Sequence, residues 1–137
     1  MSDQPTVLVI SSDEAELSVL VQVLSEHAVL HSVRELGHVE GMLKDVGYDA
    51  VFCGWSVHGG TWYEALGQVQ LRDPDLPVVV ICRTAGEREW IDVLDAGGFD
   101  LLVPPFEKFA VLAVLEQAVG SYEVRHQRSL MLSAKTS

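Results

Sequence analysis

The residues of this chain that could do chemistry lie where short apolar runs end. Ser11, Ser12 and Asp13 follow one such run, and Cys82 with Arg83 closes another. A carboxylate can bind a divalent cation, but neutral hydroxyls are poor replacements for carboxylates around a hard ion. Asp13 is therefore either a residual metal or loop ligand or the N-cap of a following helix, and we favour the cap.

Cys82 suggests a redox hypothesis. A reactive thiol needs a pKa lowered by a nearby cation or a helix N-terminus, and Arg83 is adjacent in the sequence. The alternative is a buried, inert cysteine, which we favour for both Cys82 and Cys53. Two reduced thiols, rather than a structural disulfide, suit a cytoplasmic protein.

The histidines do not predict a metal site. Five are spread along the chain without ligand spacing: His27, His31, His38, His58 and His126. The sequence also lacks a phosphate loop and a nucleophile with an acid-base pair, so we predict no enzyme, no cofactor and no metal. His58 stands in a loop with two glycines and two tryptophans, which is either a recognition surface, a lid or ordinary packing.

Five apolar or β-branched runs predict strands, and helical patterns separate them. The predicted strands are residues 6–10, 28–33, 49–53, 78–82 and 99–103. Leu17, Leu20 and Leu24 recur at helical spacing, and Gly97 with Gly98 can end the fourth helix. This alternation is typical of a doubly wound α/β fold with a five-stranded parallel sheet, whose sites lie at the carboxyl ends of its strands.

Four segments resemble a response-regulator receiver domain (CheY-like). They are YDAVFCGWSVHGGTWYEAL at 48–66, VLVISSDEAEL at 7–17, PVVVICRTAG at 77–86 and AGGFDLLVPPF at 96–106. The resemblance covers about residues 6–119. It implies the flavodoxin-like (βα)5 fold with strand order 2-1-3-4-5, a receiver-like domain at 1–120, and a helix extension or linker tail at 121–137.

The sequence departs from the family at its phosphorylation positions. Gly54 falls on the phosphorylated Asp, Ser11 and Ser12 on the acidic pair, Cys82 on the Thr or Ser, and Pro104 on the Lys. Phosphoryl transfer needs an oxygen nucleophile, a Mg²⁺ held by carboxylates, and groups that stabilise the developing charge. The resemblance therefore implies a degenerate pseudo-receiver that lacks the phosphorylation residues, with an emptied pocket at Ser11, Ser12, Asp13, Gly54, Cys82 and Pro104.

Receivers commonly pair or signal through the fourth helix, the fifth strand and the fifth helix. In this chain that surface holds the candidate interface residues Arg88, Trp90, Asp92, Asp95, Leu101, Lys108 and Phe109. Both charge signs are present, which suits a self-complementary two-fold contact. A solvated helical face is the alternative.

Composition excludes several classes of protein. The net charge of -11 argues against direct binding to nucleic acid, since phosphate backbones are bound through clustered Lys and Arg. No apolar run reaches the ~20 residues of a membrane helix, and no secretory signal is evident. We infer a cytoplasmic protein of one domain.

The resulting hypothesis is a phosphorylation-independent receiver domain that acts as a protein-protein interaction module in two-component-type signal transduction. Its partner would be a histidine kinase, an effector domain or a second copy of the chain. The alternative is a ligand-sensing pseudo-receiver that binds a small molecule in the emptied pocket. A closed apolar pocket beside Gly54 and Cys82 would support that alternative.

Overall fold

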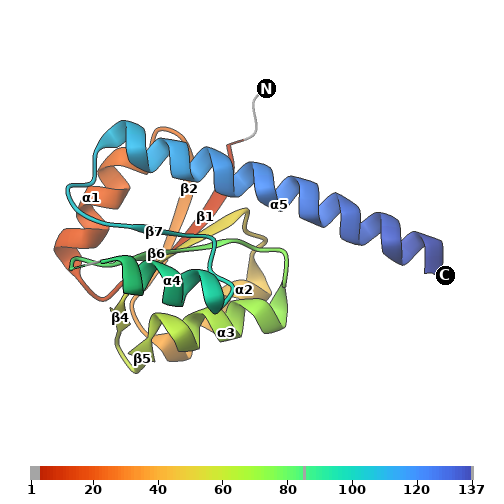
Figure 1. Ribbon diagram of the computed structural model, residues 1–137, viewed down its shortest axis with the longest axis horizontal. Coiled ribbons are helices and arrows are strands. Elements are labelled where there is room, and N and C mark those ends of the chain that lie inside the picture. The colour runs from red at the N-terminus through yellow and green to blue at the C-terminus, as the bar shows by residue number, and fades with distance from the viewer. Residues whose placement is uncertain (1–3, 85, 137) are drawn as a thin grey trace.

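The computed structural model (Figure 1) describes residues 4–84 and 86–136 and shows an α/β fold built on one five-stranded parallel sheet. The strands of the sheet are β1 (Thr6–Ile10), β2 (Val29–Val33), β3 (Ala50–Gly54), β6 (Val78–Ile81) and β7 (Asp100–Leu102). The helices are α1 (Glu14–Leu24), α2 (Val39–Asp45), α3 (Trp62–Arg72), α4 (Glu87–Asp95) and α5 (Lys108–Thr136), with a 3-10 turn η1 (Leu36–His38). All five predicted strands are present, within a few residues of their predicted ends.

The strand order is β2-β1-β3-β6-β7, and all four pairings are parallel. Counted along the parallel sheet alone, this is the predicted order 2-1-3-4-5, which is confirmed. From β1 the chain moves to β2 on one side, and it then crosses to β3, β6 and β7 on the other side. The crevice at the carboxyl ends of β1 and β3 is therefore the expected place for a site.

Helices cover both faces of the sheet, and each face has its own apolar core (Figure 1). Leu20 and Leu24 of α1 pack with Val111 and Leu115 of α5 on one face. The helices α2, α3 and α4 cover the other. Phe52 is fully buried in the central strand β3, and burial on both faces explains why the strands read as continuous apolar runs.

Glycines end α4 as the sequence predicts. Gly97 has a backbone φ angle of 100°, which residues with a side chain rarely adopt. The N–H of Gly98 donates to the carbonyl of Val93 at 2.8 Å, which satisfies a carbonyl of the last helical turn.

The loop after β3 forms a small hairpin that the sequence did not predict. Strands β4 (Ser56–Val57) and β5 (Gly60–Thr61) pair antiparallel, and Gly59 in the turn has φ 94. A Cβ on Gly60 would lie 2.5 Å from Leu36 Cδ2, so a side chain there requires Leu36 to move. His58 is exposed at this turn.

Helix α5 is 29 residues long, or about 43 Å at 1.5 Å per residue, and it projects beyond the sheet (Figure 1). Residues 121–136 continue this helix, and the domain boundary at residue 120 stays a prediction.

Tyr122 of α5 donates a hydrogen bond to Asp73, and burial together with that bond raises the pKa of the Tyr122 hydroxyl. In the part of the chain that the structure describes, no helix is both long and apolar enough to cross a membrane.

Candidate functional site

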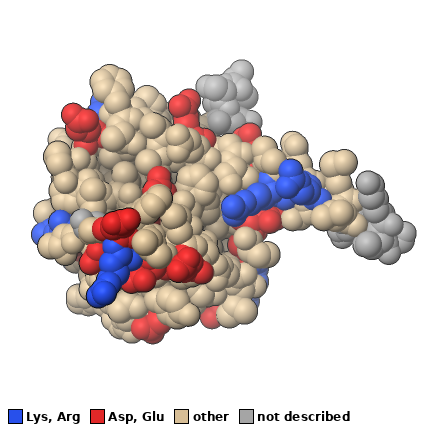
Figure 2. All heavy atoms as spheres, in the orientation of Figure 1, with Lys and Arg blue, Asp and Glu red and all other residues tan. Residues whose placement is uncertain are grey.

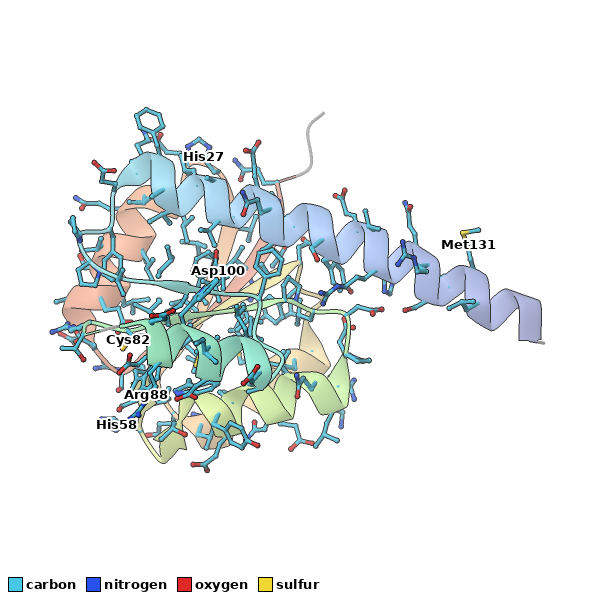
Figure 3. All side chains as sticks on the ribbon, viewed as in Figure 1. His27, His58, Cys82, Arg88, Asp100 and Met131 are labelled. Carbon is cyan, nitrogen blue, oxygen red and sulfur yellow. The ribbon has the colours of Figure 1, made fainter. Side chains whose placement is uncertain are left out.

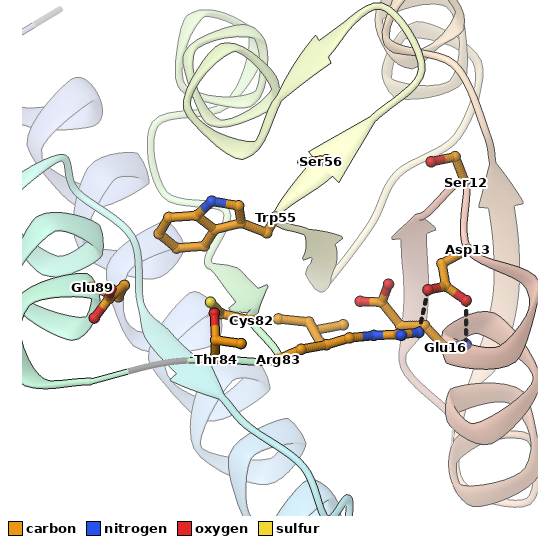
Figure 4. A pocket seen from close by; sticks show the side chains of 10 residues that line it. Ser12, Asp13, Glu16, Trp55, Ser56, Cys82, Arg83, Thr84 and Glu89 are labelled. Carbon is orange, nitrogen blue, oxygen red and sulfur yellow. Dashed lines mark hydrogen bonds and ion pairs between the residues drawn. The ribbon is translucent and has the colours of Figure 1, made fainter.

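A hollow of about 540 Å³ opens at the carboxyl ends of β1, β3 and β6 (Figure 4). Polar and charged side chains predominate in its wall. The lining residues are Ser12, Asp13, Glu16, Trp55, Ser56, Ile81, Cys82, Arg83, Thr84 and Glu89. Three predicted site residues, Ser12, Asp13 and Cys82, are therefore brought together.

Asp13 is the N-cap of α1. Its Oδ1 accepts hydrogen bonds from the backbone N–H of Ala15 at 3.0 Å and of Glu16 at 3.1 Å. The bond from Glu16 N–H is the main cause that lowers the pKa of Asp13, and Arg83 adds to the effect. The capping interpretation is thus the one that the structure shows.

The side chain of Arg83 extends across the hollow to Asp13 and forms its ion pair there rather than with Cys82. Its Nη2 forms an ion pair with Asp13 Oδ2, which joins the end of β6 to the start of α1 (Figure 4). Cys82 itself is a free, buried thiol. The redox hypothesis therefore loses the cation on which it depended.

Glu16 is the residue of this site that sequence reasoning missed. Glu16 is only 8% exposed, and Ser11 Oγ donates a hydrogen bond to Glu16 Oε2 at 3.2 Å. A Cβ built on Gly54 would lie 3.2 Å from Glu16 Oε2 and 3.3 Å from Oε1. The carboxylate of α1 therefore closes the space beside β3 into which a side chain at position 54 would extend.

Burial raises the pKa values of two groups beside Gly54, the Glu16 carboxyl and the Cys53 thiol. Burial raises the pKa of Glu16, the hydrogen bond from Ser11 opposes the rise, and the negative charge of Asp13 adds to it. Burial, with a contribution from the charge of Glu16, also raises the pKa of the Cys53 thiol to about 12. Cys53 is consequently neutral and unreactive at physiological pH.

The remaining predicted site residues lie outside the open hollow. Ser11 and Gly54 are buried behind it, and Pro104 is exposed beyond its lining. Within residues 4–84 and 86–136, no three His, Cys, Asp or Glu ligands converge at this hollow. Asp13 is engaged by the helix cap and Arg83, and Glu16 by Ser11, so we find no arrangement ready to hold a metal or cofactor here.

One tryptophan, Trp55, lines the hollow, and a second, Trp62, packs against it. The rings of Trp55 and Trp62 lie 5.4 Å apart, and Trp62 is buried at the start of α3. Trp62 therefore packs the helix onto the sheet, while Trp55 remains half-buried in the wall of the hollow.

The candidate interface residues lie on α4, β7 and the start of α5. Phe109 is 83% exposed and Trp90 46% exposed, whereas Leu101 is half-buried. The charged members of the set are exposed: Arg88, Asp92, Asp95 and Lys108. Acidic and basic side chains lie beside one another over α4 in Figure 2, and Arg88 is labelled there in Figure 3. Ile91 and Leu94 add further exposed apolar area.

Glu16→Gln is expected to increase the free energy of unfolding at neutral pH. Folding raises the pKa of Glu16 above its ordinary 4.5. The native protein is therefore most stable, as far as Glu16 is concerned, below pH 4.5, where this carboxyl is protonated. That stability is lost as the pH rises through the folded-state pKa. Glutamine stays neutral and can still accept from Ser11. Urea unfolding from pH 4 to 8 should show the gain at high pH and its decline towards pH 4.5. Glu40→Gln, an exposed control on α2, should show no such profile.

The sequence matches no family model and no curated protein. Solved structures with the same fold are nevertheless numerous. The signal receiver domain of an HD domain-containing protein from Pseudomonas fluorescens Pf-5 has a TM-score of 0.82 and 19% identity, over 93% of this chain and 96% of that one. A two-component response regulator from Clostridium difficile has a TM-score of 0.76 and 18% identity, over 85% and 96%.

A CheY-like response-regulator receiver domain protein from Methanospirillum hungatei JF-1 has a TM-score of 0.79 and 14% identity, over 90% of this chain and 99% of that one. Nearly the whole length of each of these receiver domains is matched. At such identities the comparison shows a shared fold, and the role of the chain has to be argued from its own residues.

Proposed function

We propose that this chain is a degenerate receiver domain that works without phosphorylation, as a protein-protein interaction module in cytoplasmic two-component-type signalling. The observation that carries the proposal is the Glu16 carboxylate beside Gly54. The position of the phosphoacceptor has no side chain, and the neighbouring space is filled by a group that is itself negative. A phosphoryl group carries further negative charge, so it would be repelled there.

The charges around the hollow support the same conclusion. Arg83 is the cation that faces this space, and its guanidinium is paired with Asp13. Pro104 supplies no ammonium, and it lies exposed away from the lining. The site therefore offers neither a nucleophile nor a free positive group for phosphoryl transfer.

We place the interaction surface on α4, β7 and the first turn of α5, and we propose that its partner is a histidine kinase, an effector domain or a second copy of the chain. Exposed Trp90 and Phe109 are aromatic anchors of the kind that dominate binding energy at interfaces. Arg88 and Lys108 on the one hand, and Asp92 and Asp95 on the other, provide both charge signs for a two-fold contact.

The alternative is a ligand-sensing pseudo-receiver with a small molecule in the hollow. The volume of about 540 Å³ is adequate for a ligand of modest size. The hollow is open rather than closed, its wall mixes apolar surface with charged and polar groups, and the charged pair of Asp13 and Arg83 already spans it. The interaction module is therefore the function we prefer.

Addition of Mg²⁺ and beryllofluoride, a stable mimic of the phosphoryl group, is expected to leave the amide NMR spectrum unchanged. A phosphorylatable receiver domain serves as the positive control under the same conditions. Specific, saturable shifts at Ser12, Gly54 and Cys82 would contradict the proposal and indicate an unconventional metal or anion site. Titration of small-molecule fragments into the same sample tests the alternative, which requires shifts at the lining residues.

A further inference from the structure

A second group of titratable residues lies at the opposite end of the sheet, where α5 passes the loop between α3 and β6. Tyr122, His126 and Ser129 are spaced by four and three residues, so they share one side of α5. The hydroxyl of Tyr122 donates to Asp73 Oδ2 at 2.8 Å, and that of Ser129 donates to Asp75 Oδ2 at 2.8 Å. Two carboxylates of the loop and one imidazole of the helix thereby converge.

We propose that Asp73, Asp75 and His126 form a binding site for a transition-metal ion of the zinc class. One ligand atom from each of the three residues lies within 4.8 Å of the others. Zinc binds imidazole nitrogen and carboxylate oxygen at about 2.0 to 2.2 Å, which places two tetrahedral ligands about 3.3 Å apart. The ligand atoms would therefore move closer together when the ion binds.

His126 and Asp75 face each other without a direct hydrogen bond, which leaves the lone pairs of both groups open to a cation. His126 Nδ1 lies 3.9 Å from Asp75 Oδ2, which is beyond hydrogen-bond length. Among the side chains of residues 4–84 and 86–132, neither carboxylate is paired with a lysine or arginine. A divalent cation would neutralise the two adjacent negative charges.

Each candidate ligand is also held in place by a neighbour, as metal ligands usually are. The imidazole of His126 stacks on the ring of Tyr122, with centroids 5.2 Å apart and an interplanar angle of 16°. Asp73 accepts from Tyr122 and from the backbone N–H of Asp75 at 3.1 Å, and Asp75 accepts from Ser129. Both aspartates are half-buried and His126 is exposed, so an ion can enter from solvent.

An ion at this site would join the projecting part of α5 to the loop before β6. The direction in which α5 leaves the domain would then depend on the metal. The three side chains leave at least one coordination position for water or for a group of a partner protein. The site is independent of the hollow at Gly54, because the hollow lies at the other ends of the strands.

Isothermal titration calorimetry of the full chain with ZnCl₂, and separately with MgCl₂, tests the proposal. We expect one saturable zinc site per chain, with zinc at least about tenfold tighter than magnesium. His126→Ala and Asp75→Asn should each weaken zinc binding by at least about tenfold, and Tyr122→Phe should weaken it by roughly tenfold through Asp73. His27→Ala, which removes an exposed histidine elsewhere, should leave the affinity unchanged. Circular dichroism establishes that each variant is folded.

Unchanged affinity in both His126→Ala and Asp75→Asn would overturn the proposal, as would an equal loss in His27→Ala. Binding of several ions without saturation would also overturn it, because it would indicate non-specific attraction to an acidic surface. Histidine ring signals in NMR give a second measurement. Zinc should shift the ring protons of His126 and leave those of His27 in place, and equal shifts at both would contradict the site.

Discussion

Gly54→Asp is expected to destabilise the protein by about 3 kcal/mol instead of creating a phosphoacceptor. Its Cβ would approach the Glu16 carboxylate to 3.2 Å, and its own carboxylate would be buried against that negative charge. Burial of a second, unpaired charge beside the first is the dominant cost. Urea unfolding monitored by circular dichroism measures the loss as a lower midpoint with little change in slope.

Two further variants separate charge from space. Gly54→Ala adds only the Cβ, which Glu16 can accommodate by moving a few tenths of an ångström, so its expected cost is about 1 kcal/mol or less. In a Glu16→Ala background, Gly54→Asp should lose most of its effect, and the double-mutant cycle gives the coupling energy. Equal costs in the two backgrounds would show that Glu16 is not the opposing group.

Combined Trp90→Ala and Phe109→Ala substitutions are expected to weaken self-association or partner binding by about 2 kcal/mol, or about thirtyfold in Kd. Phe109 is 83% exposed and Trp90 46% exposed, so the folded monomer depends little on either side chain. The free energy of unfolding should therefore change by only about 0.5 kcal/mol. Sedimentation velocity over a range of concentrations measures the dimer directly.

Leu71→Ala is the matched control for this surface, since Leu71 is 90% exposed on α3. It removes a large exposed apolar side chain from a different face and should leave association unchanged. If Leu71→Ala and the double substitution have the same effect, association is non-specific. If the native chain stays monomeric at the highest concentration reached, the homodimer is excluded and the surface must serve a different protein.

The strands were predictable because local pattern determines them. Five apolar runs separated by helical patterns specify a parallel sheet, and glycines such as Gly97 mark helix ends through a backbone conformation that few other residues adopt. The resemblance to receiver domains supplied the order of the strands. The hairpin of β4 and β5 was missed because strands of two residues leave almost no periodic signal.

The residues that line the candidate site were less predictable, because tertiary packing decides which side chains point into it. Asp13 could be assigned as a cap from its place before a helix. Glu16 looked like an ordinary acid in the first helical turn, and nothing in its neighbours shows that it turns inward to Gly54. Arg83 follows Cys82 in sequence, yet it pairs with Asp13 seventy positions away. Contacts at that separation follow from tertiary packing rather than from motif spacing.

The Glu16 carboxylate beside Gly54 also constrains which mutational routes are open to this chain. One base change separates some glycine codons from aspartate codons, so a change from Gly54 to an acid needs few mutations. On the structure this change is unfavourable while Glu16 is present, because the variant carries two buried carboxylates in contact. Replacement of Glu16 beforehand removes that cost. The order of the two changes therefore determines how much stability the chain loses on the way to an acid at position 54.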